Sequence, residues 1–139
     1  MIVDSSALLA ILRAEPEMLA CAQAMENAAS RRISAANFLE TAIVIDGSRD
    51  PVASRRLDDL LRAADLAIEP VTEAQARIAR EAYRDFGKGS GHAAQLNFGD
   101  CFAYALAKVT GEPLLFEGRD FSRTDIASVL DSGAQSPPE

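Results

Sequence analysis

The sequence predicts an α/β sandwich in which helices flank a mainly parallel central sheet. Short apolar runs alternate along the chain with longer stretches of helical pattern, as in folds built from strand–helix–strand units. The chain has 139 residues, the size of one domain, and 48% of them are hydrophobic, enough to bury a core without disulfides or metal. Functional side chains in such folds lie beyond the carboxyl ends of the strands, so residues that directly follow predicted strands are candidate site residues.

The first half of the chain is predicted to contain two strands and four helices. In order, these are a strand at 1–3, helices at 7–14 and 15–29, a strand at 31–34, and helices at 35–45 and 51–64. Asp4-Ser5-Ser6 is a helix-capping cluster, and Pro16 separates the first two helices. The helix at 35–45 is apolar almost all round, so we expect it to be buried.

The second half is predicted to continue the alternation, with one long irregular segment. In order, we expect an interior strand at 66–71, a helix at 72–85, a loop at 86–92, a helix at 101–109, a strand at 114–116 and a last strand at 126–130. Residues 1–131 are therefore predicted to form one domain. Residues 132–139 are rich in Gly, Ser and Pro and are expected to be a disordered tail.

Composition excludes several kinds of enzyme. A zinc site of clustered Cys and His cannot be assembled from one histidine, His92, and two distant cysteines, Cys21 and Cys101. The chain also lacks the G-x-S-x-G turn of Ser-His-Asp hydrolases. Isolated cysteines, no signal-peptide pattern and no apolar run of bilayer-spanning length predict a cytoplasmic protein. The chain has 21 acidic residues and a net charge of −7, so carboxylates are the catalytic groups that remain if it is an enzyme.

Three aspartates occupy positions where a parallel sheet would place a site. Asp4 directly follows the first strand, Asp100 begins the apolar helix at 101–109, and Asp120 lies in the loop after the strand at 114–116. Each has a structural alternative, because Asp4 and Asp100 are also well placed to cap helices and Asp120 to form an ordinary turn. Position alone therefore does not decide their role.

Glu40 is the fourth candidate. It lies in the helix at 35–45, where only Asn37, Glu40 and Thr41 interrupt the hydrophobic pattern along one narrow stripe. A buried carboxylate is costly unless it is paired, protonated or bound to a metal, and a salt bridge to an arginine is the structural alternative. If the four acids converge, each pair of charges about 5 Å apart costs roughly 3 kcal/mol, which a divalent cation removes. Oxygen ligands without His or Cys favour Mg²⁺ or Mn²⁺.

Four blocks of sequence resemble the PIN-domain ribonucleases, and in particular the VapC toxins of bacterial toxin–antitoxin pairs. The blocks are residues 1–7 (MIVDSSA), 34–40 (SAANFLE), 96–107 (LNFGDCFAYALA) and 114–125 (LLFEGRDFSRTD). They span nearly the whole chain, and the third is the most specific. The resemblance implies a PIN-like three-layer sandwich and a metal-dependent endoribonuclease, which hydrolyses RNA phosphodiester bonds.

The resemblance also implies which acids carry the chemistry. The family's catalytic acids correspond to Asp4, Glu40, Asp100 and Asp120. Asp4 and Asp100 would be the direct Mg²⁺ ligands, with Mn²⁺ as a substitute, and Glu40 would act through water or on a second metal.

The fourth acid varies in this family, so Glu117 and Asp125 stay open as alternatives to Asp120. Ser6 and Thr124 are expected to orient the carboxylates through their hydroxyls.

The partners implied are an RNA substrate, a VapB-type antitoxin protein and a second copy of the chain in a homodimer. Such antitoxins dock a helix in a groove, which apolar residues of the early helices could line: Leu8, Leu9, Ile11, Leu12 and Leu19. The alternative is a catalytically silent PIN-like module that acts by protein or RNA binding. A phosphoaspartate receiver is disfavoured, because no Asp follows a middle strand and no Lys follows a late one.

The acidic net charge argues against an RNA-binding protein. However, 12 of the 14 basic residues are arginines, which suit phosphate recognition. Arg77, Arg80 and Arg84 lie at helical spacing, although we favour ordinary pairing with Glu73 and Glu81 on a solvated face. In the glycine-rich loop, Lys88 is a candidate RNA contact.

Overall fold

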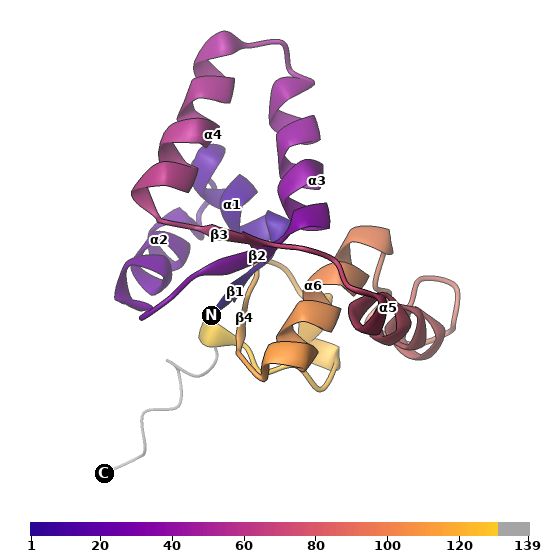
Figure 1. Ribbon diagram of the computed structural model, residues 1–139. Coiled ribbons are helices and arrows are strands. Elements are labelled where there is room, and N and C mark those ends of the chain that lie inside the picture. Colours follow the sequence, from indigo (N-terminus) through magenta and orange to yellow (C-terminus); the bar gives the residue numbers. More distant parts are fainter. Residues whose placement is uncertain (131–139) are drawn as a thin grey trace.

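The computed structural model describes residues 1–130, and the tail predicted at 132–139 lies outside the described residues. Four short parallel strands form one sheet in the order β3-β2-β1-β4 (Figure 1). They are β1 (Ile2–Val3), β2 (Arg32–Ser34), β3 (Ala67–Glu69) and β4 (Leu114–Leu115). The predicted α/β architecture with a parallel sheet is confirmed.

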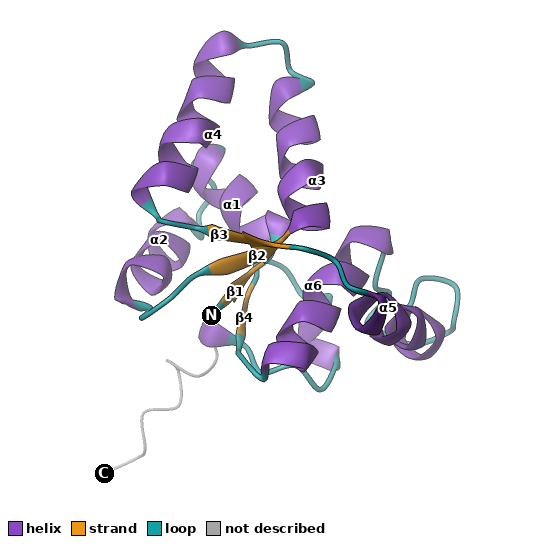
Figure 2. Cartoon of the chain, in the orientation of Figure 1, coloured by secondary structure: helices purple, strands orange, loops and turns teal. Residues whose placement is uncertain are grey.

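Helices cover both faces of this sheet. They are α1 (Ser5–Leu12), α2 (Met18–Asn27), α3 (Ala35–Asp46), α4 (Pro51–Ala63), α5 (Glu73–Phe86) and α6 (Phe98–Thr110), and the short 3-10 helix η1 (Phe121–Arg123) follows β4. Figure 2 shows α3 and α4 projecting side by side from one side of the sheet, with α5 and α6 packed together on the other. None of the helices in residues 1–130 has the length and apolar character needed to cross a membrane.

The core is divided in two by the sheet. Side chains alternate across each strand, so Ile2 and Leu114 join one cluster with α5 and α6, while Val3 and Leu115 join another with α1 and α2. All four side chains are fully buried, as expected where helices cover both faces of a parallel sheet. The sheet is therefore the rigid middle layer of a three-layer sandwich.

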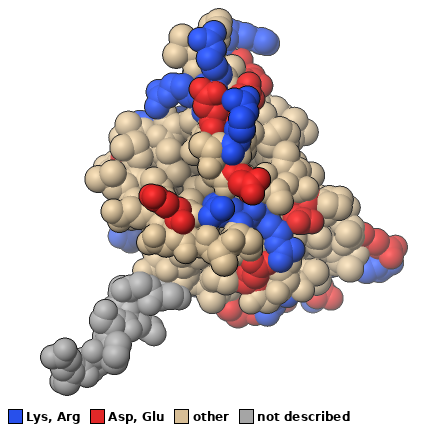
Figure 3. Space-filling model, turned by 60° about the vertical axis from the view of Figure 1, so that its left-hand side comes forward, with Lys and Arg blue, Asp and Glu red and all other residues tan. Residues whose placement is uncertain are grey.

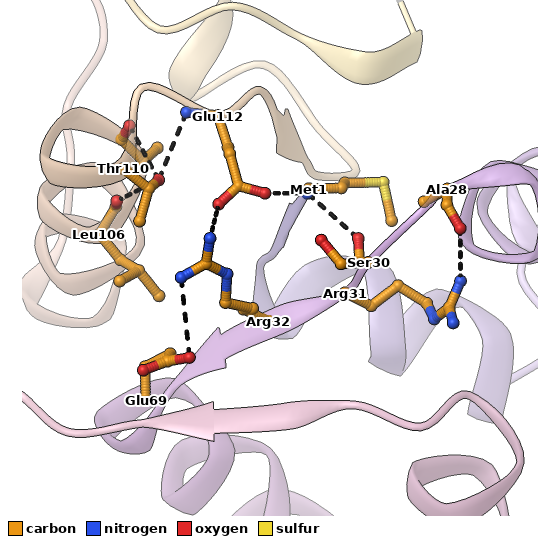
Figure 4. Close-up of polar contacts among 10 residues, drawn as sticks. Met1, Ala28, Ser30, Arg31, Arg32, Glu69, Leu106, Thr110 and Glu112 are labelled. Carbon is orange, nitrogen blue, oxygen red and sulfur yellow. Dashed lines mark hydrogen bonds and ion pairs between the residues drawn. The ribbon is translucent and has the colours of Figure 1, made fainter.

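A polar network fastens the sheet at the start of β1. The carboxylate of Glu112, just before β4, binds the amino group of Met1 and the guanidinium of Arg32, each at 2.5 Å (Figure 4). Arg32 also lies 3.8 Å from Glu69 of β3. The network thus connects all four strands. The carboxyl ends of β1 and β4, which are paired in parallel, lie together at the opposite end of these strands.

Two predicted strands differ from the structure. The segment at 66–71 was expected to be interior, but β3 is at an edge of the sheet, and Ile68 is 47% exposed. The segment at 126–130 forms no strand: only an isolated bridge joins Leu114 to Ser128. Apolar patterning indicates that a strand forms, but its place in the sheet depends on long-range pairing that the local sequence does not contain.

The prediction that α3 is buried is also wrong for much of its surface. Leu39 and Ile43 are 56% and 61% exposed, whereas the polar side chains of Asn37 and Thr41 are fully buried. The buried polar groups are stabilised by hydrogen bonds, from Thr41 Oγ1 to Asn37 O within α3 and from Asn37 Nδ2 to Gly99 O of α6. The polar stripe of α3 therefore faces inward, toward the start of α6.

Candidate active site

Asp4 lies at the carboxyl end of β1. It is the N-cap of α1, and its Oδ2 accepts hydrogen bonds from the backbone N–H of Ser6 (3.0 Å) and from Ser6 Oγ (2.6 Å). The capping role proposed as the structural alternative is therefore real. Because both Ser6 donors share one oxygen, the second oxygen of the carboxylate is not needed for the cap.

Ser6 links Asp4 to the segment after β4. Its Oγ accepts a hydrogen bond from the backbone N–H of Glu117 (3.0 Å) and donates to Asp4, so the loop and the carboxylate hold each other in place. Ser6 thus contacts a carboxylate in the way the resemblance implied. Thr124 does not: its hydroxyl bonds backbone groups of Phe121 and Ile126, and that prediction is wrong.

Glu40 reaches the same region from α3. It is half-buried and not fully enclosed, and it accepts a hydrogen bond from Ser5 Oγ at 2.6 Å and a longer one from Asn37 Nδ2 at 3.4 Å, both on Oε1. In the described part of the chain it forms no salt bridge, so the arginine partner considered above is absent. The position of Glu40 is therefore set by neutral donors, which leave its charge uncompensated.

Gly99 allows this approach of Glu40 to α6. A Cβ at Gly99 would lie 2.0 Å from Oε2 of Glu40, closer than real Cβ contacts. The roles of Ser5 and Gly99 were missed by sequence reasoning, since both depend on contacts between distant segments. The one local signal was a glycine directly before Asp100, at the start of a helix.

Asp100 is the third residue of α6 and part of a capping box. Its Oδ2 accepts from the N–H of Asn97 (3.0 Å), and its own N–H donates to Oδ1 of Asn97 (2.9 Å). The helix begins at Phe98, earlier than predicted, because Asn97 caps it. Only 8% of Asp100 and 4% of Asp4 are exposed, so two carboxylates are buried at one edge of the sheet.

The four acids influence one another electrostatically. Burial is the main cause that raises the pKa of Asp4 to about 6, and the charge of Glu40 contributes, while hydrogen bonds from Ser6 oppose the rise. Burial likewise raises the pKa of Asp100 to about 8, with the charges of Asp4 and Asp120 adding to it against the backbone bond to Asn97. The charge of Glu40 thus acts on Asp4, and the charges of Asp4 and Asp120 act on Asp100.

The three candidates for the fourth acid occupy different places. Asp120 is exposed before η1, and it raises the pKa of Asp100 both by its charge and by accepting a hydrogen bond from the protonated Asp100 side chain. Asp125 instead accepts from Tyr104 Oη at 2.7 Å and pairs with Lys108. Glu117 points its carboxylate toward other acids, described below. Of the three, Asp120 is the one that interacts with Asp100.

The donor set fits a hard divalent cation. Every candidate ligand atom is an oxygen, and neither Asp4 nor Asp100 has a cationic partner among the described residues. Close to Glu40, the buried Oδ1 of Asn37 accepts no hydrogen bond within the described chain. Buried like charges and an unused oxygen acceptor are the environment that a bound cation would relieve.

A second acidic group lies beside this one. Glu15, Glu17 and Glu117 bring oxygen atoms within 4.8 Å of one another, closer than any three of the predicted site acids in residues 1–130. All three are half-buried. Burial is the main cause that raises the pKa of Glu117, and the charges of Glu17 and Glu15 add to it. Such groups are common without an ion, and none of the four predicted acids belongs to this one.

Comparison with known proteins agrees with this architecture. A sequence profile of the PIN domain matches residues 1–127. The chain is 58% identical over 131 residues to Ribonuclease VapC28 of Mycobacterium tuberculosis, covering 94% of this chain and 98% of that protein. It is 49% identical over 129 residues to Ribonuclease VapC of Mycolicibacterium smegmatis, covering 93% and 99%.

Solved structures share the fold at low identity. The chain superposes on the crystal structure of VapC20 from Mycobacterium tuberculosis, described as a Sarcin-Ricin loop cleaving toxin, with a TM-score of 0.70, 16% identity, and coverage of 91% of this chain and 95% of that one. A toxin–antitoxin complex from Klebsiella pneumoniae gives a TM-score of 0.65, 16% identity, and coverage of 87% and 89%.

Proposed function

The chain belongs to the PIN-domain family and, within it, to the VapC ribonucleases, and from this premise we propose that it is a Mg²⁺-dependent endoribonuclease toxin neutralised by an antitoxin. The observation that carries the proposal is the burial of Asp4 and Asp100, which have no cationic partner in residues 1–130, with the charge of Glu40 acting on Asp4 and that of Asp120 on Asp100. Burying like charges together destabilises a fold, so their presence at the carboxyl edge of the sheet favours a functional over a structural role.

We assign the cation to Asp4 and Asp100, the two most buried acids. When bound, a divalent cation polarises a phosphate oxygen and lowers the pKa of water. Asn97 fixes the carboxylate of Asp100, and Ser6 fixes that of Asp4, so neither can turn away. The carboxylates of Asp4 and Asp100 are thereby held in fixed orientations in which they can bind a cation.

Glu40 is assigned to the attacking water. Ser5 holds Oε1, which leaves Oε2, the oxygen that lies against Gly99, to accept a proton from a water molecule. Asp120 is exposed and is assigned to the open side of the site, where it contributes negative charge next to Asp100. No histidine is needed for this division of roles.

The overall acidity of the chain is compatible with RNA binding. On the face shown in Figure 3, a group of basic side chains lies near the centre, with acidic side chains around it. At physiological salt, exposed charges more than about 8 Å apart are largely screened, so a polyanion responds to nearby cations more than to the net charge of −7.

The test is cleavage of RNA by the purified chain. We expect cleavage of a structured RNA with Mg²⁺ or Mn²⁺, none with chelator, and a loss of more than about 100-fold in Asp4→Asn and Asp100→Asn. Asp58→Asn, which removes an exposed carboxylate of α4, is the matched control and should keep full activity. Full activity in either site variant would refute the assignment. Absence of cleavage of any RNA in a total cellular extract would favour the silent binding module.

We propose that the antitoxin docks a helix between α1, α2 and α4. A groove of about 380 Å³ lies there, with Ile11, Met25 and Leu60 in its lining. Leu8, predicted to line such a groove, is fully buried in the core and cannot. Co-purification with the product of a small neighbouring gene, and its loss in Ile11→Glu, would test this contact.

We further propose a homodimer, supported by the exposed apolar side chains of α3. Analytical ultracentrifugation of the purified chain tests this, and we expect a single species with the mass of two chains.

A further inference from the structure

A groove between α5 and α6 begins where the acidic site ends. Its volume is about 510 Å³, within the range of about 300–1,000 Å³ that small-molecule sites occupy. Asn97 lies in its lining and also caps Asp100, and Phe98 stands two residues before that acid. The groove and the acidic site therefore meet at Asn97, at the start of α6.

The groove is rich in aromatic rings. Phe98, Phe102 and Tyr83 line it, and the rings of Phe98 and Phe102 pack edge to face with centroids 4.9 Å apart. Phe98 is 79% exposed, the largest exposed fraction among the described large hydrophobic side chains. An exposed ring offers a face on which an unpaired nucleobase can stack, the usual way in which proteins bind single-stranded RNA.

Two cations line the same groove. Arg80 of α5 and Lys88 of the following loop form no ion pair in residues 1–130, whereas Arg77 pairs with Glu73 and Arg84 with Asp85. The expected pairing of Arg77 with Glu73 is thus confirmed. Of the three arginines on this helix, Arg80 is the one without an acidic partner in residues 1–130.

The position of Lys88 is fixed by an aromatic side chain. Tyr83 Oη donates a hydrogen bond to the backbone oxygen of Lys88 (3.0 Å), which holds the loop against α5. Among residues 1–130, no acidic side chain lines the groove. Aromatic rings with unpaired cations, in a chain of net charge −7, complement a nucleic acid better than an acidic or apolar peptide.

We propose that this groove binds an unpaired nucleobase of the RNA substrate next to the scissile phosphate, with Phe98 as the stacking ring and Arg80 and Lys88 on the flanking phosphates. The inference rests on the proposed nuclease function and adds to it a preference for single-stranded RNA at the cleavage site. Phe98 and Arg80 are then substrate-binding residues, separate from the acids that carry the chemistry.

Binding is measured apart from cleavage. A fluorescein-labelled 10-nucleotide RNA of randomised sequence is titrated in Ca²⁺ and followed by anisotropy, and an abasic strand of equal length serves as the baseless probe. We expect Phe98→Ala to weaken RNA binding about 5- to 150-fold and the abasic strand hardly at all, while Phe98→Trp binds at least as well as the wild type. Val109→Ala, an exposed apolar change at the far end of α6, should change neither.

Arg80 is tested against its paired neighbour on the same helix. Arg80→Gln should weaken both strands and reduce the slope of log affinity against log salt by about 0.7, whereas Arg84→Gln should leave the slope unchanged. Equal binding by wild type and Phe98→Ala would overturn the proposal, as would equal losses for the RNA and abasic strands.

Two further measurements separate the proposal from its neighbours. If Phe98→Ala turns a dimer into a monomer in light scattering and binding falls with it, the groove is an interface between copies, and the proposal is wrong. If the wild type binds RNA through Phe98 but never cleaves it in Mg²⁺, the nuclease function fails while the base-binding groove stands.

Discussion

Gly99→Ala should abolish most of the activity and spare the fold. The added Cβ would lie 2.0 Å from Glu40 Oε2, where ordinary contact begins at 3.4 Å, so the carboxylate must move by about 1.4 Å. Misplacing a catalytic group by about 1 Å can cost about 100-fold in rate, and we expect a fall of that size in kcat.

Stability should change little, because two effects oppose each other. Moving Glu40 breaks its hydrogen bond from Ser5, at a cost of about 1 kcal/mol. Alanine in a helix is favoured over glycine by up to about 1 kcal/mol, and Gly99 does not have a positive φ that would strain the new residue. The melting temperature should therefore stay within a few degrees of the wild type.

The assay is steady-state cleavage of a fluorogenic RNA in Mg²⁺, combined with a double-mutant cycle. If Gly99→Ala acts through Glu40, adding it to Glu40→Ala should cost nothing more. A kcat within threefold of the wild type in Gly99→Ala would refute the reasoning. A large further loss in the double variant would show that Gly99 supports something other than Glu40.

Other predictions concern metal, hydroxyls and the far edge of the sheet. The pKa values of Asp4 and Asp100 are raised to about 6 and 8 in the folded metal-free protein. The contribution of their neutral forms to the free energy of unfolding is therefore fully present below about pH 4 and is lost as pH rises to 8. The melting temperature measured in chelator should thus fall from pH 5 to pH 8, and Mg²⁺ should remove most of this fall. A melting temperature in chelator that does not change with pH would contradict the prediction. Ser5→Ala should lower kcat about tenfold by freeing Glu40, with Ser5→Thr restoring part of it, as cleavage assays would show. Arg31→Met leaves three backbone carbonyls near the ends of α2 and α4 without their donor, so urea unfolding should show a loss of about 2–3 kcal/mol with kcat unchanged.

The sequence predicted the elements of this fold better than their environment. Asp4 and Asp100 could be found because capping and position after a strand are local signals, readable within a few residues. The Ser5–Glu40 hydrogen bond joins residues 35 apart, and the contact of Gly99 with Glu40 joins two helices, so neither leaves a local pattern. The same limit explains why β3 was expected in the interior of the sheet, since strand order is set by tertiary pairing.

The orientation of α3 shows how the site determines what the helix exposes. If burial of apolar area alone decided, Leu39 and Ile43 would face the core, at roughly 25 cal/mol per Å² of apolar surface removed from water. Instead the stripe with Asn37 and Glu40 faces α6, because there Asn37 Nδ2 donates to Gly99 O and the charge of Glu40 acts on Asp4. The hydrophobic side chains must then lie on the opposite surface of the same helix. An exposed apolar stripe is costly for a monomer, so the need to hold Glu40 in the site also supplies a reason for a protein partner on α3.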